Sequence, residues 1–277
     1  MIVADRHQAE RAEAFRALHQ RDEAFIIPNP WDVGTARLLA HLGFEALATT
    51  SAGHAFSLGQ LDNTLTREQM MAHLKTLASA TDLPVSADLE NGFGDLPHIV
   101  AETIRLAAGA GVVGGSIEDS TGRPGNPIYP CDLAVERVRA AAEEAGRCAF
   151  PFTLTARCEN YLVGNPDLAD TIKRLQAYQD AGANVLYAPG LSTRDEIAAV
   201  VRSVDRPVNV VMGLKGAPLR FDELKALGVR RISVGSALSR AALAAFLRGA
   251  IEMRNRGTFT FAEDALSIEE LSIPFRR

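Results

Sequence analysis

Acidic side chains stand at the ends of short apolar runs in the first half of the sequence. Asp88 and Glu90 close the run PVSADLE, Glu118 closes the run VVGGSIE, and Asp62 lies in the loop after the run ALATT. Carboxylates that share one concave site repel one another unless a cation neutralises them. Oxygen ligands suit Mg²⁺ or Mn²⁺ rather than Zn²⁺, and the six histidines form no HxH or HExxH pattern. The four carboxylates are therefore candidate ligands of Mg²⁺, with Mn²⁺ as the alternative.

A single arginine, Arg157, ends another apolar run, PFTLTAR. Its planar guanidinium can clamp a substrate carboxylate or phosphonate through two parallel hydrogen bonds. A purely structural ion pair between Arg157 and Glu118 is the alternative interpretation. Cys158 would point away from Arg157 if the strand continues, so we expect it to pack in the interior.

Eight apolar runs, rich in β-branched residues, alternate with longer amphipathic segments. Such near-continuous apolar strands are typical of a parallel sheet that is covered on both faces. The predicted strands are Phe25–Pro28, Ala46–Thr50, Pro84–Asp88, Val112–Glu118, Pro151–Arg157, Asn184–Ala188, Pro207–Met212 and Arg231–Val234. In a barrel built from them, the residues that follow the strands meet at one end.

The segments between the strands have helical spacing, as in Leu133–Ala145 and Asp167–Ala181. Several end in a glycine step just before the next strand, in LGFEAL, AGAGVV, AGANVL and LGVRRI, where glycine supplies a left-handed turn. A strand–helix unit repeated about eight times in roughly 250 residues predicts an α/β fold of the (β/α)₈ barrel type. The alternative, a doubly wound parallel sheet, requires a GxGxxG turn after the first strand. The segment there, NPWDVGT, does not contain this motif.

Composition excludes several classes of protein. The 277 residues carry 29 Lys and Arg against 34 Asp and Glu, a net charge of −5, which argues against nucleic acid as a partner. Three cysteines form no CxxC and no complete disulfide framework. The N-terminal 20 residues lack the apolar core of a signal peptide, and no apolar run reaches about 18 residues. We expect a soluble cytoplasmic protein that does not engage a membrane.

In order along the chain, seven segments resemble the isocitrate lyase/phosphoenolpyruvate mutase superfamily, in particular its short members. They are Pro28–Asp32, Ala48–Asp62, Ser86–Gly94, Gly115–Asp119, Thr155–Glu159, Ala183–Pro189 and Pro207–Met212. The resemblance implies a barrel whose last helix is exchanged between subunits of a homo-oligomer, a dimer or tetramer. It also implies Mg²⁺-dependent cleavage or rearrangement of a C–C or P–C bond through an enolate.

The resemblance further implies roles for individual residues. Asp88 would bind the metal directly, and Asp62, Glu90 and Glu118 would hold metal-bound waters. The substrate would be bound by Trp31, Ser51, Ala52, Gly53, Asp88, Arg157 and Asn209. Arg157 and Glu118 are also predicted to be catalytic.

The loop after the fourth strand, residues 120–131, departs from the family pattern. Isocitrate and methylisocitrate lyases carry a KxCG-type motif there, whereas this loop has no Lys and its only cysteine, Cys131, comes at the helix start. Asn126 falls near a family Asn position and Tyr129 is a candidate proton donor, so both are predicted to be catalytic. The segment Ala188–Gly190 replaces the polar residue expected after the sixth strand, which predicts a less polar pocket there.

Together these expectations describe one barrel domain over residues 1–277, with an N-terminal helix in 1–24 and a tail, 252–277, for assembly. The predicted function is a Mg²⁺-dependent lyase that cleaves a C–C bond, including by decarboxylation, of a small 2-oxo or 2-hydroxy carboxylic acid. The alternatives are a phosphonopyruvate-type mutase or hydrolase, and a catalytically degenerate barrel that binds a small oxoacid.

Overall fold

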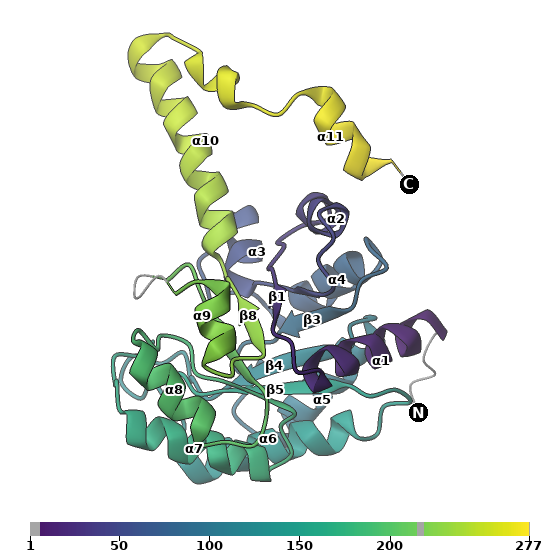
Figure 1. The fold of residues 1–277 in the computed structure, drawn as a ribbon, viewed down its shortest axis with the longest axis vertical. Coiled ribbons are helices and arrows are strands. Elements are labelled where there is room, and N and C mark those ends of the chain that lie inside the picture. The colour runs from purple at the N-terminus through teal and green to yellow at the C-terminus, as the bar shows by residue number, and fades with distance from the viewer. Residues whose placement is uncertain (1–5, 215–218, 277) are drawn as a thin grey trace.

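Eight parallel strands form one sheet in the computed structural model, which describes residues 6–214 and 219–276 (Figure 1). The strands are β1 (Phe25–Ile27), β2 (Leu47–Ala48), β3 (Val85–Asp88), β4 (Gly114–Glu118), β5 (Thr153–Arg157), β6 (Val185–Tyr187), β7 (Val208–Val211) and β8 (Arg231–Ser233). Their order is β1-β8-β7-β6-β5-β4-β3-β2, and a hydrogen bond from Ala48 N to Pro28 O, 3.1 Å long, bridges the two ends. The predicted (β/α)₈ barrel is confirmed, with all eight strands in the predicted runs.

Helices precede, connect and follow the strands, and those that connect them cover the outside of the barrel. They are α1 (Arg6–Gln20), α2 (Val33–His41), α3 (Ser51–Ser57), α4 (Arg67–Ala78), α5 (Pro97–Gly109), α6 (Cys131–Ala145), α7 (Leu168–Asp180), α8 (Arg194–Arg202), α9 (Phe221–Ala226), α10 (Ala237–Arg256) and α11 (Ile268–Phe275). The four predicted glycine steps, at Gly43, Gly111, Gly182 and Gly228, have φ between 83° and 107°. Each therefore supplies the left-handed residue that ends a helix before the next strand.

The N-terminal helix α1 closes one end of the barrel. Phe15 is fully buried, and a Cβ at Gly114 would lie 3.0 Å from its ring and 2.7 Å from Thr153 O. Gln8 fixes the helix by donating to Ala108 O and Val112 O at 2.8 and 3.0 Å. With this end closed, a ligand reaches the interior from the other end, where the carboxyl ends of the strands lie.

The chain after β8 extends away from the barrel (Figure 1). The regular barrel pattern was expected to change at residue 252, but α10 continues to Arg256 and ends at Gly257, whose φ is 63°. Residues 252–256 favour helix, and Gly257 supplies the left-handed cap, so the first five residues of the predicted tail belong to α10. Helix α11 returns to α2, where Phe275 approaches within 3.8 Å of the Cβ position at Gly34.

Large apolar side chains on α10 lie exposed, uncovered by the other residues that the structure describes. Phe246, Leu247 and Ile251 are 71%, 56% and 55% exposed. The exchange of the last helix between subunits remains a prediction, as do the single-domain boundaries, which include residues 1–5, 215–218 and 277 outside the described part. No helix within that part is long and apolar enough to cross a membrane.

Candidate active site

Asp88, at the end of β3, is held by donors from the start of α3 and from the end of β5. Its Oδ2 accepts from Ser51 N at 3.0 Å and from Ser51 Oγ at 2.8 Å. Its Oδ1 accepts from Arg157 Nη1 at 2.9 Å, and its own backbone N–H donates to Thr49 Oγ1 at 2.8 Å. The carboxylate is thus fixed in one orientation at the mouth of the barrel.

Arg157, at the end of β5, is surrounded by three carboxylates. It contacts Asp88 at 2.9 Å, Glu118 Oε2 at 3.0 Å and Glu159 Oε1 at 2.9 Å, and its guanidinium lies 5.2 Å from the centre of the Tyr187 ring. The ion pair with Glu118 that was the structural alternative is present. It is one part of a cluster that also contains the predicted metal ligand.

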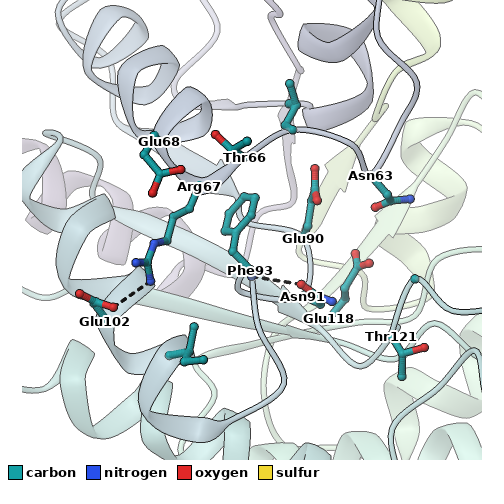
Figure 2. A pocket seen from close by; sticks show the side chains of 13 residues that line it. Asn63, Thr66, Arg67, Glu68, Glu90, Asn91, Phe93, Glu102, Glu118 and Thr121 are labelled. Atoms are coloured by element: carbon teal, nitrogen blue, oxygen red, sulfur yellow. Dashed lines mark hydrogen bonds and ion pairs between the residues drawn. The ribbon is translucent and has the colours of Figure 1, made fainter.

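Glu118 and Glu90 are buried acids that line a cavity between the loops beside the barrel mouth (Figure 2). Burial raises the pKa of Glu118 well above its usual value, against the lowering effect of Arg157. Burial, reinforced by the charges of Asp88 and Asp62, raises the pKa of Glu90 to about 8. Oε1 of Glu90 is buried without a hydrogen-bond partner, so this carboxyl group is available to a water or a cation.

The turn after β3 places Glu90 in an unusual backbone conformation. Glu90 and Phe93 have φ of 49° and 61°, a left-handed region that non-glycine residues seldom adopt. The turn is held by Phe93 N, which donates to Asn91 Oδ1 at 3.1 Å (Figure 2), and by Arg137, which donates to the carbonyls of Asn91, Gly94 and Asp95. Strain of this kind is common where a side chain must point into a functional site.

Asp62 reaches the same region from an exposed loop. Burial of its carboxylate among other acids raises its pKa, with Asp88 as the largest charged contributor, and Asn63 N donates to it at 3.0 Å. The structure therefore brings all four predicted metal ligands, Asp62, Asp88, Glu90 and Glu118, to one end of the barrel.

Two cavities meet at this cluster. A cavity of about 450 Å³ is lined by residues that include Asp62, Asp88, Glu118, Arg157 and Asn209. A second, of about 650 Å³, lies between the loops after β2, β3 and β4 and shares Asn63 and Glu118 with the first. The first cavity is large enough for a small carboxylic acid.

The start of α3 forms one wall of the smaller cavity. Thr50 caps this helix by accepting from Gly53 N at 3.2 Å, and Ser51 and Ala52 line the cavity. Gly53 is buried behind them, where a Cβ would lie 2.7 Å from Thr50 Cγ2. Trp31, also predicted to bind substrate, lines a different cavity on the outside of the barrel.

The predicted catalytic residues of the loop after β4 do not line the described cavities. Asn126 is exposed in a turn, where its N–H donates to Arg123 O at 3.0 Å. Tyr129 is only 1% exposed, and its hydroxyl donates to Asp95 Oδ1 at 2.6 Å. Its ring covers Arg137 at 4.1 Å. The arrangement gives Tyr129 a packing role, while its role as proton donor stays a prediction without a contact that supports it.

Asn209, on β7, lies inside the barrel as predicted. Its Nδ2 donates to Ser233 Oγ at 3.0 Å, and its Oδ1 accepts from Arg231 Nε at 2.9 Å. It lines the smaller cavity.

Sequence reasoning assigned no role to three residues of this site: Glu159, Tyr187 and Arg231. Glu159 holds Arg157, while Tyr187 and Arg231 line the smaller cavity. Glu159 lies two residues after Arg157. Side chains two residues apart on a strand point to the same side, and Cys158 between them points away, so this spacing could have indicated that Glu159 lies beside Arg157. Tyr187 precedes the segment Ala188–Gly190 and places a phenol where a less polar wall was expected. Two further acids lie outside this cluster of functions: Asp167 caps α7, and Asp119 is buried against Tyr178 and Arg174.

The donor set is compatible with Mg²⁺. Among residues 6–214 and 219–276, no three acidic, histidine or cysteine side chains converge into a ready-made metal cluster. Mg²⁺ requires none, because it is commonly bound by one or two carboxylates and keeps several waters. An ordered Asp88, with the unpartnered Oε1 of Glu90 nearby in the same acidic group, fits this mode of binding.

Comparison with known proteins identifies the family of the chain. The phosphoenolpyruvate phosphomutase family model matches residues 15–254. A crystal structure from Burkholderia cenocepacia J2315, described only as a lyase/mutase, is 65% identical, has a TM-score of 0.96, and covers 99% of this chain and 98% of its own. Oxaloacetate decarboxylase of Bradyrhizobium sp. ORS 278 is 28% identical over 81% of this chain and 77% of its own.

A further solved relative was crystallised with ligands. Phosphonopyruvate hydrolase in complex with oxalate and Mg²⁺ is 25% identical, has a TM-score of 0.83, and covers 95% of this chain and 94% of its own. The superfamily thus includes enzymes that cleave C–C bonds and enzymes that act on P–C bonds. The barrel, its acidic mouth and the family match over most of the chain agree: the protein belongs to the phosphoenolpyruvate mutase/isocitrate lyase superfamily.

Proposed function

We propose that this protein is a Mg²⁺-dependent lyase that cleaves a C–C bond, including by decarboxylation, of a small 2-oxo or 2-hydroxy carboxylic acid. One observation carries the proposal. The Asp88–Arg157 pair, 2.9 Å apart, lines a cavity of about 450 Å³ beside acids whose pKa values are raised. A cation at Asp88 and the guanidinium of Arg157 would together hold an anionic substrate.

The chain's own residues would prepare this site for an anion. Arg157 Nη1 donates to Asp88, so the guanidinium lies beside the carboxylate that would hold the cation and could donate to the substrate's carboxylate there. Ser51 N–H and Oγ keep Asp88 oriented toward the cavity. Mg²⁺, when bound, would stabilise negative charge that develops on the substrate's α-oxygen.

Glu90 and Glu118 are the buried acids from which a proton could come. In the metal-free protein, burial favours the neutral form of both carboxyl groups and raises the pKa of Glu90 to about 8. Such a group can return a proton to the enolate that remains after bond cleavage. Of the two, Glu118 is the stronger candidate for the proton donor, because it lines the smaller cavity together with Asp88 and Arg157.

Chemistry at a P–C bond is the second candidate function, favoured by the similarity to phosphonopyruvate hydrolase. It would require the site to hold a phosphonate of higher charge. Of the described residues that line the smaller cavity, only Arg157 and Arg231 are cationic, and Arg157 already contacts three carboxylates. Among these described lining residues, Arg231 is then the one cation without a carboxylate partner, which suits a dicarboxylate better than a phosphonate of higher charge and favours the C–C lyase.

A substrate panel tests the proposal. Oxaloacetate, 2-methylisocitrate, dimethylmalate and phosphonopyruvate are assayed with Mg²⁺ or with EDTA, using the unmodified protein, Asp88→Ala, and the exposed control Asp82→Ala. We expect Mg²⁺-dependent turnover of a C–C substrate, a loss of at least about 10³-fold in Asp88→Ala, and little change in the control. Turnover that survives Asp88→Ala would contradict the metal role. Retained Mg²⁺ binding without turnover of any compound would favour a barrel that only binds an oxoacid.

A further inference from the structure

Arg231, on β8, is a buried cation inside the barrel. The residue is 5% exposed. Its Nε donates to Asn209 Oδ1 at 2.9 Å and its Nη2 to Thr155 Oγ1 at 3.0 Å, while Nη1 lies 3.4 Å from His19 Nε2. These three contacts come from β7, β5 and α1, so the guanidinium crosses the interior of the barrel.

None of the groups around Arg231 neutralises its charge. Within 6–214 and 219–276, no carboxylate lies within ion-pair distance of it, whereas Arg157 has three such partners and Arg174 has two. His19 is a neutral neighbour: its Nδ1 contacts Phe15 O at 2.8 Å, and burial lowers its pKa to about 3. A buried charge without a counterion is costly, and burial lowers the pKa of Arg231 to about 10.

The position of Arg231 connects it to the site. Paired positions on neighbouring strands run from Glu118 to Arg157, Tyr187, Asn209 and Arg231. Its partner Thr155 is on the same strand as Arg157, two residues closer to the closed end of the barrel. Arg231 also lines the cavity that Asp88 and Arg157 line. It therefore lies at the floor of this cavity, one layer of side chains below the acidic cluster.

The two arginines of the cavity are consequently not equivalent. Arg157 is surrounded by carboxylates, and its charge is largely offset before any ligand binds. The charge of Arg231 is offset by nothing in the described chain. The charge of Arg231 would therefore attract an anion in the cavity, and the attraction energy would grow in proportion to the anion's charge.

We propose that Arg231 is a positioning residue for the substrate anion: it orients the Asn209 amide in the cavity, and its unpaired charge favours ligands of higher negative charge, such as dicarboxylates. This inference rests on the proposed function only in that the natural ligand is a carboxylate. It narrows the substrate class from small oxoacids in general to those that carry two negative charges in the cavity.

The test compares a dianion with a monoanion of similar size. Oxalate and pyruvate are titrated calorimetrically into the full-length protein with saturating Mg²⁺, using the unmodified chain, Arg231→Met, Arg231→Gln and Arg231→Lys. The matched control is Arg230→Met, because Arg230 is the neighbouring arginine but pairs with Asp22 at the surface. Arg231→Gln provides a neutral variant that keeps hydrogen-bonding groups if Arg231→Met does not fold.

Loss of a field effect scales with ligand charge, so the neutral variants should weaken oxalate binding about tenfold and pyruvate binding only about threefold. Arg231→Lys should restore the preference for oxalate, and Arg230→Met should leave both affinities within about twofold. Equal weakening of the two anions would indicate a structural role alone and would overturn the inference. So would an absence of binding of either anion to the unmodified protein.

The outcomes also separate this inference from the proposed function. A protein that binds both anions with the expected dependence on Arg231 but turns over none of the panel contradicts the lyase and supports the inference. Turnover of a panel substrate with an unchanged ratio of affinities in Arg231→Gln contradicts the inference alone.

Discussion

Glu90 makes the acidic cluster sensitive to pH, and its replacement by glutamine isolates that sensitivity. In the metal-free protein its pKa is raised from an ordinary 4.5 to about 8, first by burial and then by the charges of Asp88 and Asp62. The folded state therefore retains a proton between about pH 4.5 and 8 that the unfolded state releases. Stability contributed in this way is complete below pH 4.5 and is lost as the pH rises through 8.

The size of the effect follows from the same values. Each pKa unit corresponds to about 1.4 kcal/mol, so the full change between pH 4.5 and 8 is about 5 kcal/mol as an upper bound. Between pH 6.5 and 8 the share is about 2 kcal/mol. The buried His19 and His73, whose pKa values burial lowers to about 3, act in the opposite direction up to about pH 6.5. The difference between variant and unmodified protein removes this histidine contribution.

We expect Glu90→Gln to match the unmodified protein in stability near pH 5 and to exceed it by about 2–5 kcal/mol at pH 8–9 with EDTA present. Urea denaturation at several pH values measures this difference. Mg²⁺ should reduce it, because a bound cation stabilises the ionised carboxylate of the unmodified protein. Glu102→Gln, an exposed acid on the wall of the second cavity, is the control and should leave the pH dependence unchanged. Parallel stability curves for Glu90→Gln and the unmodified protein would refute the reasoning.

Three further variants test other parts of the structure. Arg157→Met leaves three carboxylates without their cation. We expect the free energy of unfolding to fall by about 3–5 kcal/mol at pH 7 and by less at pH 5, as measured by urea denaturation. Equal losses at the two pH values would contradict the electrostatic origin of the effect. Arg137→Met removes the donor shared by three carbonyls of the turn after Glu90. We expect the free energy of unfolding to fall by about 2–4 kcal/mol and amide hydrogen exchange in residues 91–95 to become faster. Unchanged exchange would show that the turn is stable without Arg137. Phe246→Asp places a charge on the apolar face of α10. We expect light scattering to give a smaller assembly mass for this variant than for the unmodified protein or for Leu96→Asp, a control at another exposed position. An unchanged mass would exclude this face of α10 from assembly.

The fold could be predicted because each level of the sequence agrees with the others. Glycines at the helix ends, such as Gly43 and Gly182, adopt the left-handed conformation that the pattern required. The eight apolar runs are strands because both of their faces are covered, by the barrel interior and by the outer helices. The strand-end rule then located Asp88, Glu118 and Arg157 correctly, since parallel strands bring their carboxyl ends to the same side.

The parts of the site that could not be predicted depend on side chains that cross the barrel. No pattern within β8 indicates that Arg231 reaches Thr155 on β5, because this contact joins positions 76 residues apart. The same holds for Tyr129, a predicted proton donor whose hydroxyl donates to Asp95 on a different loop, a contact that no local pattern indicates. A polar residue at a strand end indicates that chemistry is possible there, but only its neighbours decide whether its charge is offset. Arg157 and Arg231 demonstrate the difference: both are arginines inside one barrel, but Arg157 pairs with three carboxylates, whereas Arg231 has no carboxylate partner among the described residues.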